Sequence, residues 1–169
     1  MNRGNNPVVS VAMGSDTDIS VMEEAVSILK EFGIPHEILL TSAHRSPERT
    51  AAFAQGAAGR GIKVIIVGAG MAAHLAGVIA SMTPLPVLGV PIDSSPLSGM
   101  DALFSTVQMP GGIPVATMAI GKAGAKNAAL LAVRILALED KELRARLDDY
   151  RKGMADGVEK RNRTLQAMK

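Results

Sequence analysis

The sequence predicts a three-layer α/β/α fold around a central sheet of about five parallel strands. Two patterns carry this prediction. Short apolar runs alternate along the chain with segments that have helical spacing. The apolar runs are continuous instead of alternating with polar residues, which is typical of strands covered by helices on both faces. We therefore expect a doubly wound, flavodoxin-like sheet with right-handed crossovers.

Strands and helices are expected to alternate regularly. The strands are predicted at residues 8–13, 36–40, 63–67, 86–90 and 114–119. The helices are predicted at residues 18–32, 47–60, 72–81, 100–108, 124–138 and 141–166. Ser46 is expected to cap the second helix, and Gly61 is expected to end it.

No repeat or linker interrupts this order, so residues 1–169 are expected to form a single domain with a core at about 8–139. The extra C-terminal helix, at about 141–166, has few apolar positions after Leu147. A helix of this polarity either lies in solvent or packs on another chain. We expect it to pack on a neighbouring subunit.

The composition argues against several classes of function. Aromatic residues make up only 2% of the chain and the formal net charge is +2. Nucleic-acid binders usually combine a basic face with exposed aromatic rings, so no nucleic-acid partner is expected. The absence of cysteine excludes disulfides, thiolate metal sites and cysteine nucleophiles. The three histidines, His36, His44 and His74, lack the spacing of metal ligands, so no metal is expected.

One stretch without formal charge, residues 64–82, is nearly long enough to span a bilayer. Glycines interrupt it, however, and no aromatic or basic anchors flank it. Residues 1–7 are polar and lack the apolar core of a secretion signal. We therefore expect a soluble, cytoplasmic protein with no membrane partner.

Ligands of parallel α/β sheets bind beyond the carboxyl ends of the strands, and three predicted loops there carry unusual residues. In the first, residues 13–18, Gly14 lets the backbone approach a ligand, and the following helix offers free N–H groups to anions. The alternative, which this loop taken alone favours, is plain N-capping by Ser15 or Thr17. The two aspartates, Asp16 and Asp18, would repel a phosphate and are better partners for ribose hydroxyls.

The second loop, residues 41–47, places hydroxyl groups, His44 and Arg45 close together. Arginine is suited to bidentate contact with phosphate, and histidine is the side chain that most readily transfers protons near neutral pH. A single loop histidine can also be structural or solvated, so both interpretations stay open.

The third loop, residues 68–74, fits the pattern G-x-G-x-x-A of dinucleotide-binding sites. Asp93 follows at about the sequence spacing expected of the acidic residue that contacts the ribose in such a site. The alternative is a tight turn with close helix packing and His74 in the core. A later apolar loop, residues 108–114, either lines a pocket or simply turns the chain.

Six segments together resemble the N5-carboxyaminoimidazole ribonucleotide mutase family (class I PurE). They are residues 13–18, 42–47, 68–77, 83–91, 107–116 and 123–132. The resemblance covers residues 8–138, and the Ser-Ala-His-Arg run at 42–45 is its most specific part. It implies a cofactor-free isomerase of de novo purine (IMP) biosynthesis. Such an enzyme converts 5-(carboxyamino)imidazole ribonucleotide into 4-carboxy-5-aminoimidazole ribonucleotide by decarboxylation and recarboxylation.

The same resemblance implies a role for individual residues. His44 would be the general acid and base, and Ser15, Asp18 and Arg45 would bind the ribonucleotide. The other residues implied at this pocket are Gly14, Thr17, Ser42, Ala43, Gly70, Met71, Ala72 and His74. The family also implies a homo-octamer with sites between subunits, and functional coupling to the ATP-dependent carboxyaminoimidazole ribonucleotide synthase.

Two departures of the chain from the family pattern matter for the site. Met71 stands where the family usually has glycine, and Ala76 stands where it usually has proline. The bulk of Met71 predicts a different loop geometry or different handling of CO₂. Arg45 favours the mutase over a CO₂-dependent carboxylase branch, which typically has lysine after the loop histidine. Two further alternatives are an NAD-binding oxidoreductase built on the Gly68 turn and a non-catalytic nucleotide-binding module.

Overall fold

A five-stranded parallel sheet forms the centre of the protein in a computed structural model that describes residues 6–168. Its strands are β1 (Val9–Met13), β2 (His36–Leu40), β3 (Val64–Gly70), β4 (Val87–Ile92) and β5 (Ala116–Thr117). They lie in the order β2-β1-β3-β4-β5, and every neighbouring pair is parallel. This is the order of flavodoxin-like doubly wound sheets, so the predicted fold class is confirmed.

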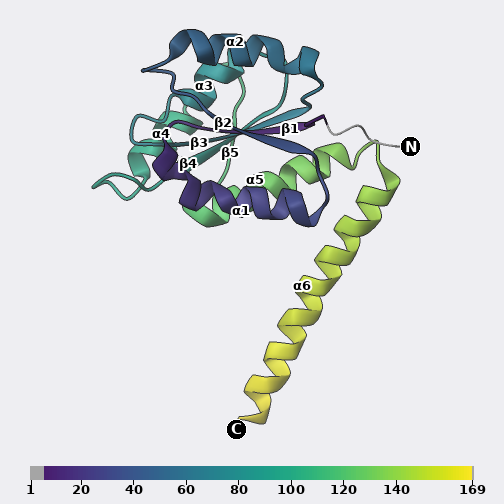
Figure 1. The fold of residues 1–169 in the computed structure, drawn as a ribbon. Coiled ribbons are helices and arrows are strands. Elements are labelled where there is room, and N and C mark those ends of the chain that lie inside the picture. Colours follow the sequence, from purple (N-terminus) through teal and green to yellow (C-terminus); the bar gives the residue numbers. More distant parts are fainter. Residues whose placement is uncertain (1–5, 169) are drawn as a thin grey trace. The chain divides into compact units, whose positions relative to one another are not determined.

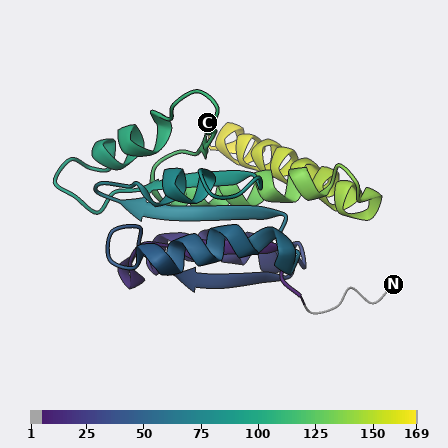
Figure 2. The ribbon, with the colours of Figure 1, turned by 90° about the horizontal axis from the view of Figure 1, so that it is seen from above.

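Helices cover both faces of this sheet (Figure 1). They are α1 (Ile19–Glu31), α2 (Pro47–Ala57), α3 (Leu75–Ala80), α4 (Met100–Val107), α5 (Gly121–Leu136) and α6 (Lys141–Ala167), with short 3₁₀ turns η1 (Asp16–Asp18) and η2 (Ala58–Arg60). The helices α2 and α3 lie on one face, with the strands running beneath them in Figure 2, and α1 and the part of α5 up to Ala132 lie on the other.

The core under α2 and α3 is built from small and aliphatic side chains. Ile65 and Val67 of β3 pack with Ala54 of α2 and with Leu75 and Ile79 of α3, and all five are buried. Alanine brings helices close to a sheet, and branched aliphatic residues then fill the remaining volume at native packing density. A chain with few aromatic residues can form a dense core in this way.

Strand β3 is longer than predicted, because Gly68, Ala69 and Gly70 belong to the strand and not to a turn. The ladder with β4 continues as far as the pair Gly70 and Ile92, which the local sequence does not reveal. Glycine is required at both ends of this extension. A Cβ on Gly68 would overlap the Met22 sulfur, and a Cβ on Gly70 would overlap the Ser94 hydroxyl. Helix α3 therefore begins at Leu75, three residues later than predicted.

Two further predictions differ from the structure in detail. Ser46 occupies the N-cap position of α2, but its hydroxyl donates to the Ser42 carbonyl and accepts from the Ser42 N–H, so it does not cap the helix. Strand β5 has only two residues, Ala116 and Thr117, which pair with Leu88 and Gly89 at the edge of the sheet. Pro114, at the start of the predicted strand, has no N–H to donate to a ladder. The predicted stop at Gly61 is confirmed, with a left-handed φ of 92°.

The chain divides into two compact units, Met1–Ala132 and Val133–Lys169. The prediction of a single domain stays a prediction. In the second unit the Asp140 carboxylate accepts hydrogen bonds from the N–H groups of Glu142 and Leu143, at 3.1 Å each, and so caps α6. Arg144 donates to the carbonyls of Ala137 and Leu138 at 3.2 Å each, which closes the turn before this helix.

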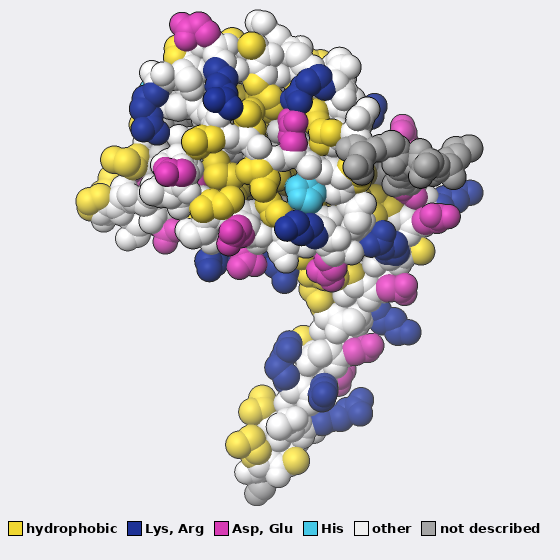
Figure 3. Space-filling view, viewed as in Figure 1, with side chains coloured by type: hydrophobic (Ala, Val, Ile, Leu, Met, Phe, Trp, Pro, Cys, Tyr) yellow, Lys and Arg dark blue, Asp and Glu magenta, His cyan; other side chains and the backbone are white. Residues whose placement is uncertain are grey.

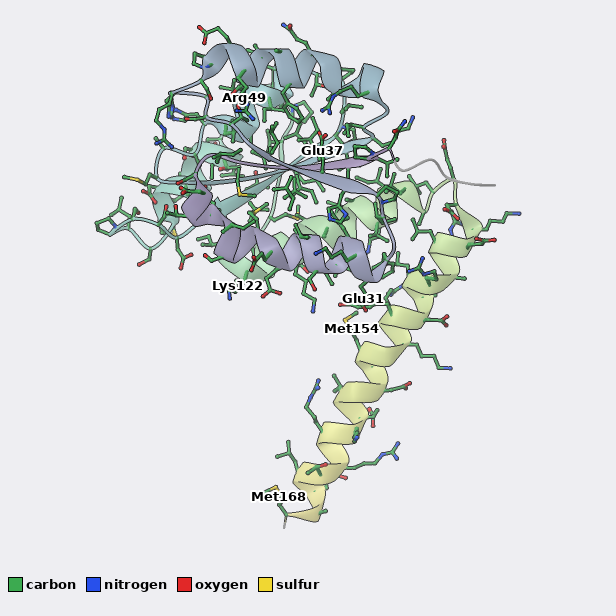
Figure 4. The ribbon with its side chains drawn as sticks, in the orientation of Figure 1. Glu31, Glu37, Arg49, Lys122, Met154 and Met168 are labelled. Carbon is green, nitrogen blue, oxygen red and sulfur yellow. The ribbon has the colours of Figure 1, made fainter. Side chains whose placement is uncertain are left out.

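Helix α6 carries an apolar stripe although most of its residues are polar. Leu143, Leu147, Met154, Val158 and Leu165 recur at spacings of four and seven residues and therefore share one face of the helix. The last three of these, and Met168, are exposed to solvent. Figure 4 labels Met154 and Met168 on this helix.

Within residues 6–168 no helix is both long and apolar enough to cross a membrane. Of the segment predicted to lack a secretion signal, residues 1–5 lie outside the described part of the chain.

Candidate functional site

A cavity of about 520 Å³ opens at the carboxyl edge of the sheet. It lies between the loops that follow β1 and β3, where the strand order reverses and where doubly wound folds bind ligands. Its lining consists of Gly14, Ser15, Thr17, Asp18, Ser42, Ala43, His44, Arg45, Ala69, Gly70, Met71, Ala72, Leu75 and Ser94. Every residue of the predicted site is in this set except His74.

The loop after β1 forms a capping box that also faces the cavity. The Ser15 hydroxyl accepts from the Thr17 N–H, and the Asp18 carboxylate accepts from the Ser15 N–H at 3.1 Å. The capping interpretation is therefore confirmed, and it coexists with a place in the cavity wall. Only 4% of Asp18 is exposed. Burial raises the pKa of this carboxyl above its usual value, while hydrogen bonds from the backbone of Ser15 and Gly14 act in the opposite direction.

The loop after β2 is held in a tight turn that presents two exposed side chains. The Ser46 N–H donates to the Ser42 carbonyl at 2.9 Å, and the Arg45 N–H donates to the Ser42 hydroxyl at 3.2 Å. His44 and Arg45 are both exposed at the turn. The Arg45 guanidinium donates to the Gly14 carbonyl at 3.1 Å, so it connects this loop with the loop after β1.

The structure brings His44 and His74 together. Nε2 of His44 lies 2.9 Å from Nδ1 of His74, and the two rings meet edge to face with 5.1 Å between centroids. One nitrogen of this pair must hold the shared proton and the other must accept it. His74 is exposed, so the alternative of a core histidine is wrong. It contacts His44 but is not among the residues that line the cavity.

Met71 has an unusual backbone conformation for a residue with a side chain. Its φ of 54° lies in the left-handed region, which costs a non-glycine residue about 1–3 kcal/mol. The turn is fixed by hydrogen bonds. The Ala73 N–H donates to the Met71 carbonyl at 2.9 Å and to the Ser105 hydroxyl of α4 at 3.0 Å. The surrounding contacts therefore hold Met71 in a conformation that it would not choose alone.

Three lining residues and one supporting residue were not predicted. Ala69, Leu75 and Ser94 line the cavity, and Ser105 holds the Met71 turn. Ser94 follows the carboxyl end of β4, so the rule that identified the other three loops could have found it. The apolar loop 108–114 does not line this cavity. Its residues Gly112–Pro114 line a second cavity of about 410 Å³ together with Ala80–Leu85.

The arrangement combines a cationic group, hydroxyl groups, a pair of imidazoles and an apolar wall. Arg45 supplies the guanidinium, Ser15 a hydroxyl and Asp18 a carboxylate. A guanidinium can form two parallel hydrogen bonds with an anionic group. Ala43, Ala69 and Leu75 supply apolar surface. Within residues 6–168 no group of three or more His, Cys, Asp or Glu side chains is placed to hold a metal ion.

This fold and cavity define a class of protein, a doubly wound α/β chain with a partly polar cavity at the switch point of its sheet. The chain belongs to the AIR carboxylase family, whose model matches residues 8–157.

Relatives named N5-carboxyaminoimidazole ribonucleotide mutase match nearly the whole chain. The one from Pyrococcus horikoshii is 55% identical over 166 residues, which cover 98% of this chain and 93% of the relative. The one from Escherichia coli is 54% identical over 159 residues, 94% of each chain. A crystal structure of Treponema denticola PurE has a TM-score of 0.85 at 31% identity and covers 94% of this chain and 98% of that chain. The resemblance predicted from the sequence is confirmed.

Proposed function

We propose that this chain converts 5-(carboxyamino)imidazole ribonucleotide into 4-carboxy-5-aminoimidazole ribonucleotide in purine biosynthesis, without a cofactor. The observation that carries the proposal is the position of His44, which shares one cavity with Arg45 and is hydrogen-bonded to a second imidazole. Relatives that carry the mutase name at 52–56% identity support the same reaction. Two chemical requirements, binding of an anionic nucleotide and transfer of a proton, are met by neighbouring residues of one loop.

The substrate is proposed to lie between the loops that follow β1, β2 and β3. Arg45 binds the phosphate, because a guanidinium forms two parallel hydrogen bonds with such a group. Ser15 and Asp18 bind the ribose hydroxyls from the first turn after β1. The imidazole ring of the substrate then lies against Ala43 and Ala72, with the carboxylate of the substrate toward His44.

The proposed reaction has two steps, in which His44 first donates one proton and later accepts another. In the first, protonated His44 gives its proton to the exocyclic nitrogen. The bond from this nitrogen to the carboxylate carbon breaks, its electrons stay on nitrogen, and CO₂ is released. In the second, ring C4 attacks the carbon of CO₂ and forms the new bond. Neutral His44 then removes the C4 proton, which restores the aromatic ring and leaves His44 protonated for the next turnover.

His74 is proposed to position His44 for these proton transfers. The hydrogen bond between them occupies Nε2 of His44 and so sets which nitrogen of that ring is free. A fixed tautomer and ring orientation improve proton transfer, since a general acid must lie within hydrogen-bond reach of its target.

The chain is further proposed to assemble into a homo-octamer. Two surfaces support association. The edge strand β2 exposes Ile38 and Leu40, at 51% and 48%, and Figure 3 shows hydrophobic side chains gathered over this face of the protein. The apolar stripe of α6 is the second surface, and we propose that it packs on a neighbouring subunit. We also place the enzyme in the cytoplasm, functionally coupled to the ATP-dependent synthase that makes its substrate.

The nearest alternative is a carboxylase that uses the uncarboxylated ribonucleotide and CO₂, which the name of the AIR carboxylase family favours. The test is formation of the C4-carboxylated product from two starting materials. One is the N-carboxylated ribonucleotide without added bicarbonate, and the other is the uncarboxylated ribonucleotide with bicarbonate. Fast turnover of the first and little of the second supports the mutase. The opposite result would assign the carboxylase.

A further inference from the structure

The mouth of the cavity is formed in part by Met71. This residue lines the cavity, yet 58% of it is exposed in the single subunit, so it lies at the opening that the subunit itself forms. Its thioether side chain is flexible and apolar, which allows it to cover an irregular opening. The neighbouring residues Gly70 and Ala72 have no side chain beyond Cβ. Met71 is therefore the one large side chain that this loop contributes to the lining.

The backbone of Met71 is strained, and the strain can be traced to its side chain. Glycine adopts a φ near 54° without steric cost, whereas methionine does not. Hydrogen bonds from Ala73 and through Ser105 of α4 hold the turn in place. The Ser105 hydroxyl is itself anchored on the Asp101 carbonyl at 2.6 Å. Backbone strain at a non-glycine residue that is held in place by its surroundings indicates a functional role for the side chain.

We propose that the Met71 side chain covers the mouth of the cavity and retains released CO₂ until ring C4 captures it. The inference rests on the proposed function, in which CO₂ exists free in the cavity between two steps. CO₂ is small and uncharged and forms no strong polar contact, so the cavity holds it by limiting its escape. Ala43, Ala69, Leu75 and Met71 provide the apolar lining for this purpose.

The proposal makes a paired prediction about both directions of CO₂ movement. A cover that slows escape of CO₂ must also slow its entry from solution, because both movements cross the same opening. Removal of the cover should therefore raise two quantities together. One is the amount of uncarboxylated ribonucleotide released per product, and the other is the exchange of the transferred carboxylate with dissolved CO₂.

The experiment uses Met71→Gly, which removes the side chain and relieves the strained φ, with Met71→Leu as the matched control that keeps an apolar side chain. Each enzyme receives unlabelled N-carboxylated ribonucleotide in buffer with ¹³C-labelled bicarbonate. Mass spectrometry measures the labelled fraction of the product, and a second assay measures the uncarboxylated ribonucleotide. We expect both quantities to rise severalfold in Met71→Gly and to stay near the wild-type values in Met71→Leu. Thermal unfolding should show Met71→Gly to be at least as stable as the wild type.

The outcomes separate this inference from the proposed function. Equal labelling in Met71→Gly and wild type, with equal release of the uncarboxylated ribonucleotide, would overturn the role of Met71 and leave the mutase intact. A loss of all turnover in Met71→Gly that remains folded would also overturn it, since the side chain would then be needed for the chemistry itself. A wild-type enzyme that forms no product from the N-carboxylated substrate would instead refute the proposed function.

Discussion

Replacement of Gly70 by alanine should destabilise the protein through a defined collision. A Cβ at this position would overlap the Ser94 hydroxyl and would lie 3.0 Å from the Ser94 Cβ and 3.1 Å from the Ile92 carbonyl oxygen. The hydroxyl can rotate away, but the carbonyl belongs to strand β4 and can move only with the sheet. Overpacking of this kind typically costs about 1–3 kcal/mol. We expect Gly70→Ala to lower the free energy of unfolding by an amount in that range.

The collision with Ser94 can be removed by a second substitution. Ser94→Ala deletes the hydroxyl but leaves the Cβ and the Ile92 carbonyl in place, so the double variant should regain only part of the loss. A coupling energy of about 1 kcal/mol between the two positions is expected for residues in contact. Gly111→Ala is the control, because no atom lies within 4 Å of a Cβ there. It should change stability by less than about 0.5 kcal/mol.

Denaturant unfolding of the four variants, with kcat/KM measured in parallel, tests this reasoning. Both Gly70 and Ser94 line the cavity, so a shift of the β3 end should also reduce activity in Gly70→Ala. Strictly additive effects of the two substitutions, or a Gly70→Ala variant as stable as Gly111→Ala, would refute the predicted collision.

Three other predictions concern the charged residues. Arg45→Ala should weaken ribonucleotide binding by about 1.5–3 kcal/mol, roughly ten- to a hundredfold in KM, because a charge-assisted contact is lost. A titration calorimetry experiment that finds unchanged affinity would contradict this role. The Arg60 guanidinium, which forms two 2.8 Å hydrogen bonds with Glu37, lowers the pKa of Glu37 below its ordinary value of 4.5. The stabilisation by Glu37 is therefore complete above pH 4.5 and is lost as the pH falls through the lowered pKa that Glu37 has in the folded protein. Glu37→Gln should reduce the free energy of unfolding at pH 7 by under about 1 kcal/mol and have no effect at pH 2. Burial raises the pKa of Asp18 above 3.8, so its ionised form is disfavoured in the native state. The unfolding free energy of the wild type relative to Asp18→Asn should fall as the pH rises from 3.8 through the raised native value, opposite in sign to Glu37, and a flat difference would contradict it.

The edge of the sheet where the ligand-binding loops lie is predictable from the sequence. Continuous apolar runs identify buried parallel strands, and ligands bind beyond their carboxyl ends, so the order of apolar runs alone assigns the loop with His44 and Arg45 to this edge. Strand β2 was predicted with the bounds His36–Leu40 that the structure has. Figure 4 places Glu37 on this strand and Arg49 on α2, beside a shallow hollow between the two elements.

The contacts between distant residues could not be predicted in the same way. Whether Gly68 and Gly70 form a turn or a strand depends on pairing with β4, and the motif alone favoured the turn. The hydrogen bond between His44 and His74 joins residues 30 positions apart and depends on how the loops after β2 and β3 meet. The hydroxyl of Ser46 has local partners of two kinds, the helix N–H groups and the Ser42 backbone, and the tight turn at 42–46 selects the second.

The conformation of Met71 shows most clearly what the local sequence does not reveal. Its bulk at a position where the family usually has glycine predicts an altered loop geometry. The left-handed φ and the support from Ser105 do not follow from the local sequence, because α4 lies about thirty residues further along the chain.

The most direct test of the account is turnover and binding by His44→Asn. Asparagine keeps a polar amide near the position of Nδ1, not of Nε2 through which His44 contacts His74, and it cannot transfer a proton. The variant should bind the ribonucleotide with an affinity close to that of the wild type and lose at least about a hundredfold in kcat with the N-carboxylated substrate, the lower range for a lost general acid and base. Turnover near the wild-type rate would contradict the assignment of His44, and with it the mechanism proposed for this cavity.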